Sequence, residues 1–276
     1  MTPHAARDAA RRNERLASAD MAAFARALAQ LAPELGSVTF PFADGHAVLC
    51  GRGMYVNHVL GAGFDTLPDD AEFDRFEAAA AALGRPARIE VHEHTIPELA
   101  GRLAARGYVE DADDRTAGLA LELGSAPETP TTLPLDVRIV ETDADLARWQ
   151  GASAAGWGHH APERRLASDR FCAAAHATQT PGLLLAHSPD DGRIVGCASL
   201  SIGDSVAQLG GMSTMPAERG RGVQQALVRH RLDLARAAGC ELAVTHADVD
   251  GGSIRNLRRL GFVTTHTKTA WSRPLG

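Results

Sequence analysis

The fold is decided by residues 210–232, which read GGMSTMPAERGRGVQQALVRHRL. A strand-like run and a proline are followed by Arg219-Gly220-Arg221-Gly222, which leads directly into an expected helix. Glycines in such a turn let backbone N–H groups point at one small volume, and the helix N-terminus adds the positive end of its dipole. The segment therefore predicts a site for a phosphate or pyrophosphate group.

Two common nucleotide-binding motifs do not fit this turn. A dinucleotide fingerprint needs Gly-x-Gly-x-x-Gly, and Gln225 stands where the third glycine is required. A Walker loop needs Gly-Lys-Ser/Thr, and the one lysine of the chain is Lys268, far from the turn. A tight turn without a ligand stays open as an alternative, so the surrounding elements must decide.

Helical and β-like patterns alternate on both sides of this segment, which predicts an α/β fold. In the second half we expect strands at 137–142, 183–187, 193–202, 206–214 and 241–247, and helices at 143–157, 162–177, 223–239 and 253–261. In the first half we expect helices at 3–31, 69–84 and 96–108, and strands at 37–40, 46–50, 57–64, 87–93 and 115–123.

A stretch rich in proline and threonine, GSAPETPTTLPL, separates these halves at residues 124–135 and is expected to be a linker. We therefore predict one domain at 1–123 and a second at 136–276. Residues 87–108 can be laid against 240–262 as strand, turn, helix and Gly-aromatic, with one residue of slippage. One fold is thus expected to occur twice in the chain, although two alanine-rich helices could produce such a match by chance.

Composition limits the partners of this protein. The 276 residues are 45% hydrophobic and 22% charged, with a net charge of −6, as in a soluble globular protein. This charge provides no basic field for nucleic acid or an anionic membrane. The four cysteines are widely spaced, and no apolar run reaches the length of a membrane span. We expect a cytoplasmic protein with reduced thiols.

The Gly-rich turn resembles the acetyl-CoA loop of the GCN5-related N-acetyltransferases (GNAT), whose signature is Arg/Gln-x-x-Gly-x-Gly/Ala. Residues 219–224 match it up to the last position, where Gln224 replaces glycine or alanine. A downstream helix ending in Leu-Gly-Phe, residues 260–262, is similar to one in this family. The resemblance implies two tandem GNAT-like domains of class α/β (α+β). Each would have a mixed, mostly antiparallel sheet flanked by helices, with a splayed strand pair at the CoA cleft.

The same resemblance implies which residues hold acetyl-CoA. The end of the strand at 206–214 would offer backbone N–H groups to the pantetheine arm and the thioester carbonyl, the turn would bind the pyrophosphate, and a later asparagine would bind the amides of the cofactor. These residues are Met212, Ser213, Thr214, Arg219, Gly220, Arg221, Gly222, Val223, Gln224, Gln225 and Asn256. The corresponding part of the first half, GFDTLPDDAEFDRF at 63–76, is acidic and lacks paired glycines. It is therefore expected to be a degenerate copy without cofactor.

The acid and base of the reaction are less well defined. Relatives often use a tyrosine four residues before the glycine of Gly-Phe, and that position is Leu257. Tyr55 or Tyr108 could reach the site, or water could protonate the thiolate. Histidine is the usual base near neutral pH, and the candidates are His246 and His160, with Glu218 and Asp248 as further candidates. No metal is expected, because His92-x-His94 has no third ligand at a suitable spacing.

The expected function is transfer of the acetyl group of acetyl-CoA to an amine of a small molecule or peptide by direct attack. An acyl-CoA-binding sensor, or a GNAT-fold protein with other acyl-CoA chemistry, is the alternative, because the usual tyrosine is missing. Acetyl-CoA is the expected co-substrate, and the oligomeric state is expected to be monomer or homodimer.

Overall fold

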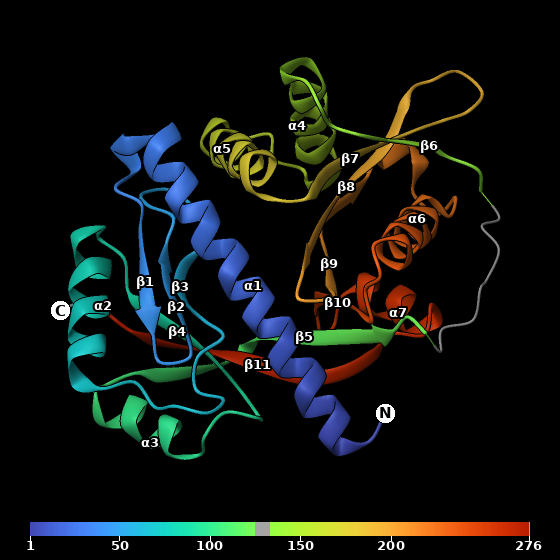
Figure 1. Cartoon of the computed structure of the whole chain (residues 1–276). Helices are drawn as coiled ribbons and strands as arrows, with labels where there is room; N and C mark the ends of the chain where they lie inside the picture. Colours follow the sequence, from blue (N-terminus) through green and yellow to red (C-terminus); the bar gives the residue numbers. More distant parts are fainter. Residues whose placement is uncertain (125–132, 276) are drawn as a thin grey trace. The chain divides into compact units, whose positions relative to one another are not determined.

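The computed structural model describes residues 1–124 and 133–275 (Figure 1). Most of the predicted linker at 124–135 lies outside the described residues. The chain forms two compact units. The N-terminal unit comprises residues 1–120, 246–255 and 262–276, and the C-terminal unit comprises residues 121–245 and 256–261. These units differ from the contiguous domains predicted at 1–123 and 136–276, and those domain boundaries stay a prediction.

Most elements of the N-terminal unit overlap the predicted ranges, but the strand predicted at 115–123 begins six residues earlier, at Val109, and the strand Val263–Arg273 lies outside those ranges. The elements are α1 (Pro3–Leu31), the 3-10 turn η1 (Pro33–Leu35), β1 (Val38–Phe42), β2 (Gly45–Leu49), β3 (Asn57–Leu60), α2 (Asp70–Ala82), β4 (Ala87–His92), α3 (Glu98–Ala105), β5 (Val109–Glu122) and β11 (Val263–Arg273). Three elements have residues in both units: β5, whose last two residues belong to the C-terminal unit, β10 (Leu242–Asp248) and α7 (Gly252–Arg259).

Strand pairing explains why the end of the chain belongs to the N-terminal unit. The strand order in this unit is β1-β2-β3-β4-β11-β5. Strand β11 pairs antiparallel with β4, where Lys268 is opposite His92, and with β5, where Val263 is opposite Ala120. The last strand of the chain thus lies between two strands of the first half. This pairing of β11 could not be predicted from the order of elements along the sequence.

Two helices cover the sheet of the N-terminal unit. Helix α1 packs against β1, β2, β3 and β11, and helix α2 packs against β2 and β4. Side chains alternate between the two faces of β2, so each face contacts a different helix. His46 is hydrogen bonded to Ser18 of α1, whereas Ala47 and Leu49 pack in the same core cluster as Phe73 of α2. Capping starts both helices, with Thr2 at α1 and a capping box of Asp69 and Glu72 at α2.

The C-terminal unit has the strand order β10-β9-β8-β7-β6. Its remaining elements are β6 (Asp136–Ile139), α4 (Asp143–Trp157), α5 (Pro162–Thr178), β7 (Pro181–His187), β8 (Ile194–Gly203), β9 (Val206–Thr214), the 3-10 turn η2 (Pro216–Glu218) and α6 (Val223–Ala237). Figure 1 shows α4 and α5 on one side of β7, β8 and β9, and α6 on the other. Buried Trp149 of α4 donates its indole N–H to the carbonyls of Leu184 and Ala198.

The same order of elements recurs in the two units. In each, antiparallel strands lead into a strand, a loop and a helix, and the next strand pairs in parallel with the strand before the loop. In the N-terminal unit, β3 pairs with β4 at Val59 and Ile89. In the C-terminal unit, β9 pairs with β10 at Val206–Gln208 and Leu242–Val244. Among the described residues, no helix has both the length and the apolar character needed to cross a membrane.

Candidate functional site

The turn before α6 has the geometry of an anion site. Gly220 and Gly222 have φ angles of +77° and +87°, a conformation that favours glycine. A Cβ atom added at either glycine would meet no described heavy atom within 4 Å, so the turn borders open space. Gly222 is also the N-cap of α6, and as a glycine it has no side chain to cap this end. The turn thus leads directly into the N-terminus of a helix, the part of a helix that attracts anions.

The corresponding loop of the N-terminal unit is occupied by carboxylates of the protein itself. Asp44 accepts hydrogen bonds from the backbone N–H groups of Gly63 and Asp65, at 2.5 and 2.8 Å. At the N-terminus of α2, Asp69 accepts from the N–H of Glu72, and Glu72 accepts from the N–H groups of Asp69 and Ala43. Several backbone donors of this loop are thus bound by carboxylates of the protein itself, and the absence of a cofactor from this unit stays a prediction.

Two residues singled out by sequence, Gln224 and Asn256, contact each other in the C-terminal unit. The side-chain amide of Asn256 donates to Oε1 of Gln224 at 2.5 Å. This bond connects the first turn of α6 with α7. Gln224 stands where the family signature has glycine or alanine, and its amide fixes the orientation of Asn256.

The two arginines of the turn are held in different ways. Arg219 donates to the carbonyl of Gly156 at 2.6 Å, and Arg221 pairs with Glu218 at 2.8 Å. Glu218 is only 8% exposed and also binds Arg193. Because its carboxylate forms ion pairs with two guanidinium groups, Glu218 is less suited to act as a base than the sequence suggested.

Strand β9 carries a bulge at the predicted thioester-binding segment. Cys197 is opposite Ser213 and Ser199 is opposite Gly210, so Gly211 and Met212 together face one residue of β8. Ser213 is buried and its hydroxyl donates to the carbonyl of Ala152. Beyond the paired residues Val206–Gln208, β9 continues from Leu209 to Thr214, as expected for a strand that separates from its parallel neighbour.

A buried arginine lies behind this bulge. Arg231 of α6 is 1% exposed and donates to the carbonyls of Ser199 and Gly210, at 3.0 and 3.1 Å, and to the sulfur of Met212. In the part of the chain that the structure describes, no carboxylate pairs with it. Burial lowers the pKa of Arg231 to about 9, so the guanidinium stays charged at neutral pH. Its hydrogen bonds fix the two strands on both sides of the bulge.

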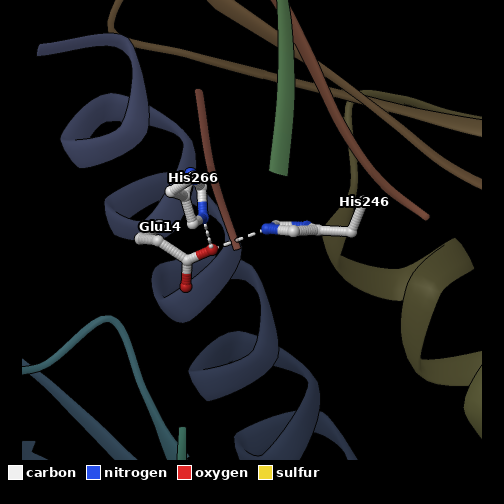
Figure 2. Close-up of side chains that lie close together, drawn as sticks. All are labelled: Glu14, His246 and His266. Atoms are coloured by element: carbon white, nitrogen blue, oxygen red, sulfur yellow. Dashed lines mark hydrogen bonds and ion pairs between the residues drawn. The ribbon is translucent and has the colours of Figure 1, made fainter. Parts of the chain in front are cut away.

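The base candidate His246 belongs to a polar cluster in the N-terminal unit (Figure 2). Its Nε2 atom lies 2.6 Å from Oε1 of Glu14, on α1, and Nε2 of His266, on β11, lies 2.9 Å from the same oxygen. Lys268 adds its ammonium group 3.2 Å from Oε1 of Glu14 and 2.6 Å from Oε2 of Glu90. Glu14 is 1% exposed and Lys268 is 6% exposed. The negative charge of Glu14 and the positive charge of Lys268 therefore compensate each other inside the protein.

Electrostatics sets the protonation of this cluster. Burial works against the charged form of Glu14, but Lys268 and His246 outweigh it and hold the pKa of Glu14 well below its usual value. Burial and Lys268 lower the pKa of His246, and Glu14 opposes them. His246 is therefore neutral at pH 7. Because the carboxylate of Glu14 can only accept, the Nε2 atom of His246 carries the hydrogen and Nδ1 carries the lone pair.

The remaining acid and base candidates are placed less favourably. His160 is exposed after the C-terminus of α4, in the C-terminal unit, and no contact of its side chain suggests activation. Tyr108 is buried in the N-terminal unit, where its hydroxyl donates to Glu77 at 3.2 Å, and burial raises its pKa. Tyr55 is exposed on the same unit, and Leu257 is buried.

The cluster also contains the donors of a possible metal site. Glu14, His246 and His266 present three ligand atoms within 4.8 Å of one another. A divalent cation there would compete with the Lys268 ammonium group for the same carboxylate oxygen, so a hydrogen-bonded network fits these residues better. His94 points its Nε2 atom to the carbonyl of Thr265, at 2.9 Å, and does not join this donor set.

Sequence reasoning missed three residues of these sites: Glu14, Asp44 and Arg231. Glu14 and Arg231 are buried charged residues, whereas Asp44 is exposed and accepts hydrogen bonds from backbone N–H groups. Glu14 lies on a helix full of charges, and only its contact with residues more than 200 positions later reveals its role. For Arg231, a charge among the apolar positions of a helix was an available signal. Asp44 had none, because turns commonly contain aspartate.

Comparison with known proteins agrees with this geometry. The acetyltransferase (GNAT) family matches residues 145–262. The chain therefore carries a GNAT domain. The matched range contains the β9 bulge, the glycine turn, α6 and α7, so the sequence resemblance to this family is confirmed. No curated protein matches the chain significantly.

Solved structures show that the GNAT fold extends beyond this range. A GCN5-related N-acetyltransferase from Kribbella flavida is 22% identical and superposes with a TM-score of 0.60 over 91% of this chain and 96% of that chain. Another from Sphaerobacter thermophilus is 17% identical, with a TM-score of 0.56 over 74% and 66%. A tandem GNAT protein from the clavulanic acid biosynthesis pathway is 16% identical, with a TM-score of 0.57 over 75% and 69%.

These likenesses confirm the predicted fold class of tandem GNAT-like units, each with a mixed sheet flanked by helices. The GNAT fold implies an acyl-CoA and an acceptor as substrates, and proteins of this family are generally N-acetyltransferases. At this level of identity the solved structures establish the fold alone.

Proposed function

We propose that this protein is an N-acetyltransferase that moves the acetyl group of acetyl-CoA to the amine of a small molecule or peptide. The observation that carries this proposal is the turn in front of α6, where Gly220 and Gly222 both have positive φ angles and lead directly into the N-terminus of the helix. The matching loop of the N-terminal unit has its amides bound by Asp44. One unit of the chain is thus suited to a pyrophosphate, and the other is not.

The backbone of residues 219–225 would bind the pyrophosphate of acetyl-CoA. Arg219 and Arg221 add positive charge, although Arg221 shares its charge with Glu218. Val223 is buried, so it contributes its backbone N–H and anchors α6 in the core. Gln225 lies on the first turn of α6, where its N–H is among those that a helix leaves without a partner.

The pantetheine arm would bind along Met212, Ser213 and Thr214, the end of β9 that runs beyond its parallel pairing. Backbone N–H groups at the bulge would polarise the thioester carbonyl, which becomes negatively charged during attack. Asn256, oriented by Gln224, would hydrogen bond to an amide of the arm.

The acceptor amine must lose a proton, and His246 is the proposed general base. It is neutral at pH 7, its Nδ1 atom carries a lone pair, and its side chain is 19% exposed. His246 follows Val244, the last residue of β10 that pairs with β9, by two positions in the sequence. His160 is the second candidate for this role.

The thiolate of CoA needs little help to leave. With cysteine as a guide, its thiol has a pKa of about 8.5, so water can protonate it at neutral pH. This fits Leu257 at the position of the usual tyrosine and Tyr108 in a buried bond to Glu77. A sensor that binds acyl-CoA without turnover is the second candidate, and the missing tyrosine favours it.

The proposal is tested with the full chain, acetyl-CoA and a panel of small amines and peptides, by following free thiol. Thiol release with one class of amine, lost in Gly222→Glu and reduced at least tenfold in His246→Asn, is the expected result. Tight binding of acetyl-CoA with no release for any amine would favour the sensor. Equal activity of His246→Asn and the wild type, with a loss in His160→Asn, would transfer the role of base to His160.

A further inference from the structure

The carboxylate of Glu14 is directed at the proposed base. Its Oε1 atom accepts a hydrogen bond from Nε2 of His246 at 2.6 Å, a distance typical of a charge-assisted hydrogen bond (Figure 2). Such a bond fixes the tautomer and ring orientation of an imidazole and makes its other nitrogen more basic. Here the other nitrogen is Nδ1, which is the nitrogen that would take the proton of the acceptor.

Glu14 is itself held in place. Its Oε1 atom also faces Nε2 of His266, and the ammonium group of Lys268 lies 3.2 and 3.3 Å from its two oxygens. The other ring nitrogen of His266 is hydrogen bonded to Thr265 at 3.0 Å. A carboxylate that is 1% exposed with these donors has one stable position and stays ionised.

The largest electrostatic effects on the pKa of His246 come from groups on α1 and β11. Helix α1 supplies the Glu14 carboxylate, which favours protonated His246, and β11 supplies Lys268 and His266, which disfavour it. Glu90 of β4 pairs with Lys268 and with His58, and it is not among the groups with the largest effects on the pKa of His246. Two carboxylates therefore share one lysine, but only one of them contacts the histidine.

We propose that Glu14 is the positioning residue for His246. During attack, Nδ1 of His246 accepts the proton of the amine while Nε2–H stays bonded to Glu14, so the imidazolium forms beside a carboxylate. The amine nitrogen bonds to the carbonyl carbon, and the C–S bond breaks to give the CoA thiolate. This inference rests on the proposed function and on His246 as its base.

The test compares Glu14→Gln with Glu90→Gln. Both variants remove one negative charge beside Lys268, but only Glu14→Gln removes the carboxylate that His246 contacts. In Glu14→Gln we expect kcat to fall at least tenfold, and the pH at which activity rises to shift downward, because the pKa of His246 loses the effect that raised it. Glu90→Gln should keep this pH and stay within about threefold of the wild-type kcat, since general-base effects depend on direct contact.

A readout without catalysis uses nitrogen NMR of the histidines in the full-length protein. His246 should appear as the Nε2–H tautomer at pH 7.5, and its pKa should fall in Glu14→Gln. A wild type in the Nδ1–H tautomer overturns the inference even if Glu14→Gln fails to fold. An active enzyme whose pH profile is the same in both variants overturns it and leaves the proposed function standing. A wild type that releases no thiol with any amine overturns the proposed function, and with it the catalytic part of this inference.

Discussion

The carboxylate of Asp44 lies 2.5 Å from the backbone nitrogen of Gly63 and 2.8 Å from that of Asp65. An acidic side chain of the protein thus occupies the amides of the N-terminal loop, in the place along the chain where the C-terminal unit has Gly220 and Gly222. An internal carboxylate needs no loss of translational freedom to bind, so a soluble phosphate would compete poorly for these donors. This contact is the physical basis for expecting one cofactor per chain.

Replacing Asp44 with alanine should destabilise the N-terminal unit. Two backbone N–H groups would lose their acceptor, but water can replace it at the exposed Asp65, so we expect a loss of about 0.5–1.5 kcal/mol in the free energy of unfolding. Urea unfolding measures the loss. Asp65→Ala is the control, because it removes an ion pair with Arg11 in which both side chains are at least 40% exposed, and such pairs contribute little. Equal losses in the two variants would show that the Asp44 bonds are not special.

The contact between Gln224 and Asn256 predicts a measurable coupling. Alanine at both positions should cost less than the sum of the two single changes, with a coupling energy of about 0.5–1.5 kcal/mol in the free energy of unfolding. Pairing Gln225→Ala with Asn256→Ala serves as the control and should be additive. Additivity in both pairs would mean that the amide bond between α6 and α7 is absent in solution.

Arg231 predicts a test of the β9 bulge. In Arg231→Met the carbonyls of Ser199 and Gly210 lose their donor, so we expect a loss of about 2 kcal/mol in the free energy of unfolding. Arg231→Lys should recover part of this loss, because its ammonium group can donate to one carbonyl. The control Arg236→Met, on the same helix, removes a surface pair with Asp233. A fully stable Arg231→Met would show that removing a buried charge offsets the lost bonds.

The buried histidines predict that stability falls in acid. Burial lowers the pKa of His92 to about 3, against about 6.5 in an unfolded chain. Between these values the unfolded chain holds a proton that the folded chain does not. The free energy of unfolding therefore decreases as the pH drops from 6.5, by up to about 1.4 kcal/mol per pH unit. Burial also lowers the pKa of His58 and His246, which act in the same direction.

His92→Phe isolates this contribution. A phenylalanine keeps a ring beside Phe64, whose centroid lies 4.2 Å from that of His92, but it cannot titrate. Urea unfolding is measured at several pH values between about 4 and about 7, the range set by these pKa values. The change of the free energy of unfolding with pH should be smaller in His92→Phe than in the wild type, by the amount that corresponds to about one proton. The same slope in both proteins would contradict the buried, neutral state of His92.

Most of the fold could be predicted from the sequence, because its signals are local. Capping residues, alternation and glycine turns mark the ends of the elements, and the predicted helix at 3–31 coincides with α1. The family motif at residues 219–224 located the candidate cofactor loop. The exchange of β11 into the N-terminal unit could not be predicted, since strand pairing depends on partners far away in the chain.

The acid–base cluster was predicted only in part. His246 was a candidate because histidine titrates near neutrality, but its partner Glu14 lies 232 residues earlier. No spacing rule connects such residues. The ion pair of Lys268 and Glu90 follows from the pairing of β11 with β4. In this register Lys268 is opposite His92, which is two positions from Glu90, and the sequence does not reveal the register.

Calorimetric titration of acetyl-CoA into the full chain tests the central claim most directly. We predict one site per chain in the wild type, no binding in Gly222→Glu, which places a negative charge in the turn, and binding with a modest loss of affinity in Gly222→Ala. Both variants place a side chain at a position with positive φ, and this strain costs about 1 kcal/mol. Gly222→Ala therefore shows the effect of the strain alone, without the added negative charge. Two sites per chain, or unchanged affinity in Gly222→Glu, would contradict the assignment of the cofactor loop to the C-terminal unit.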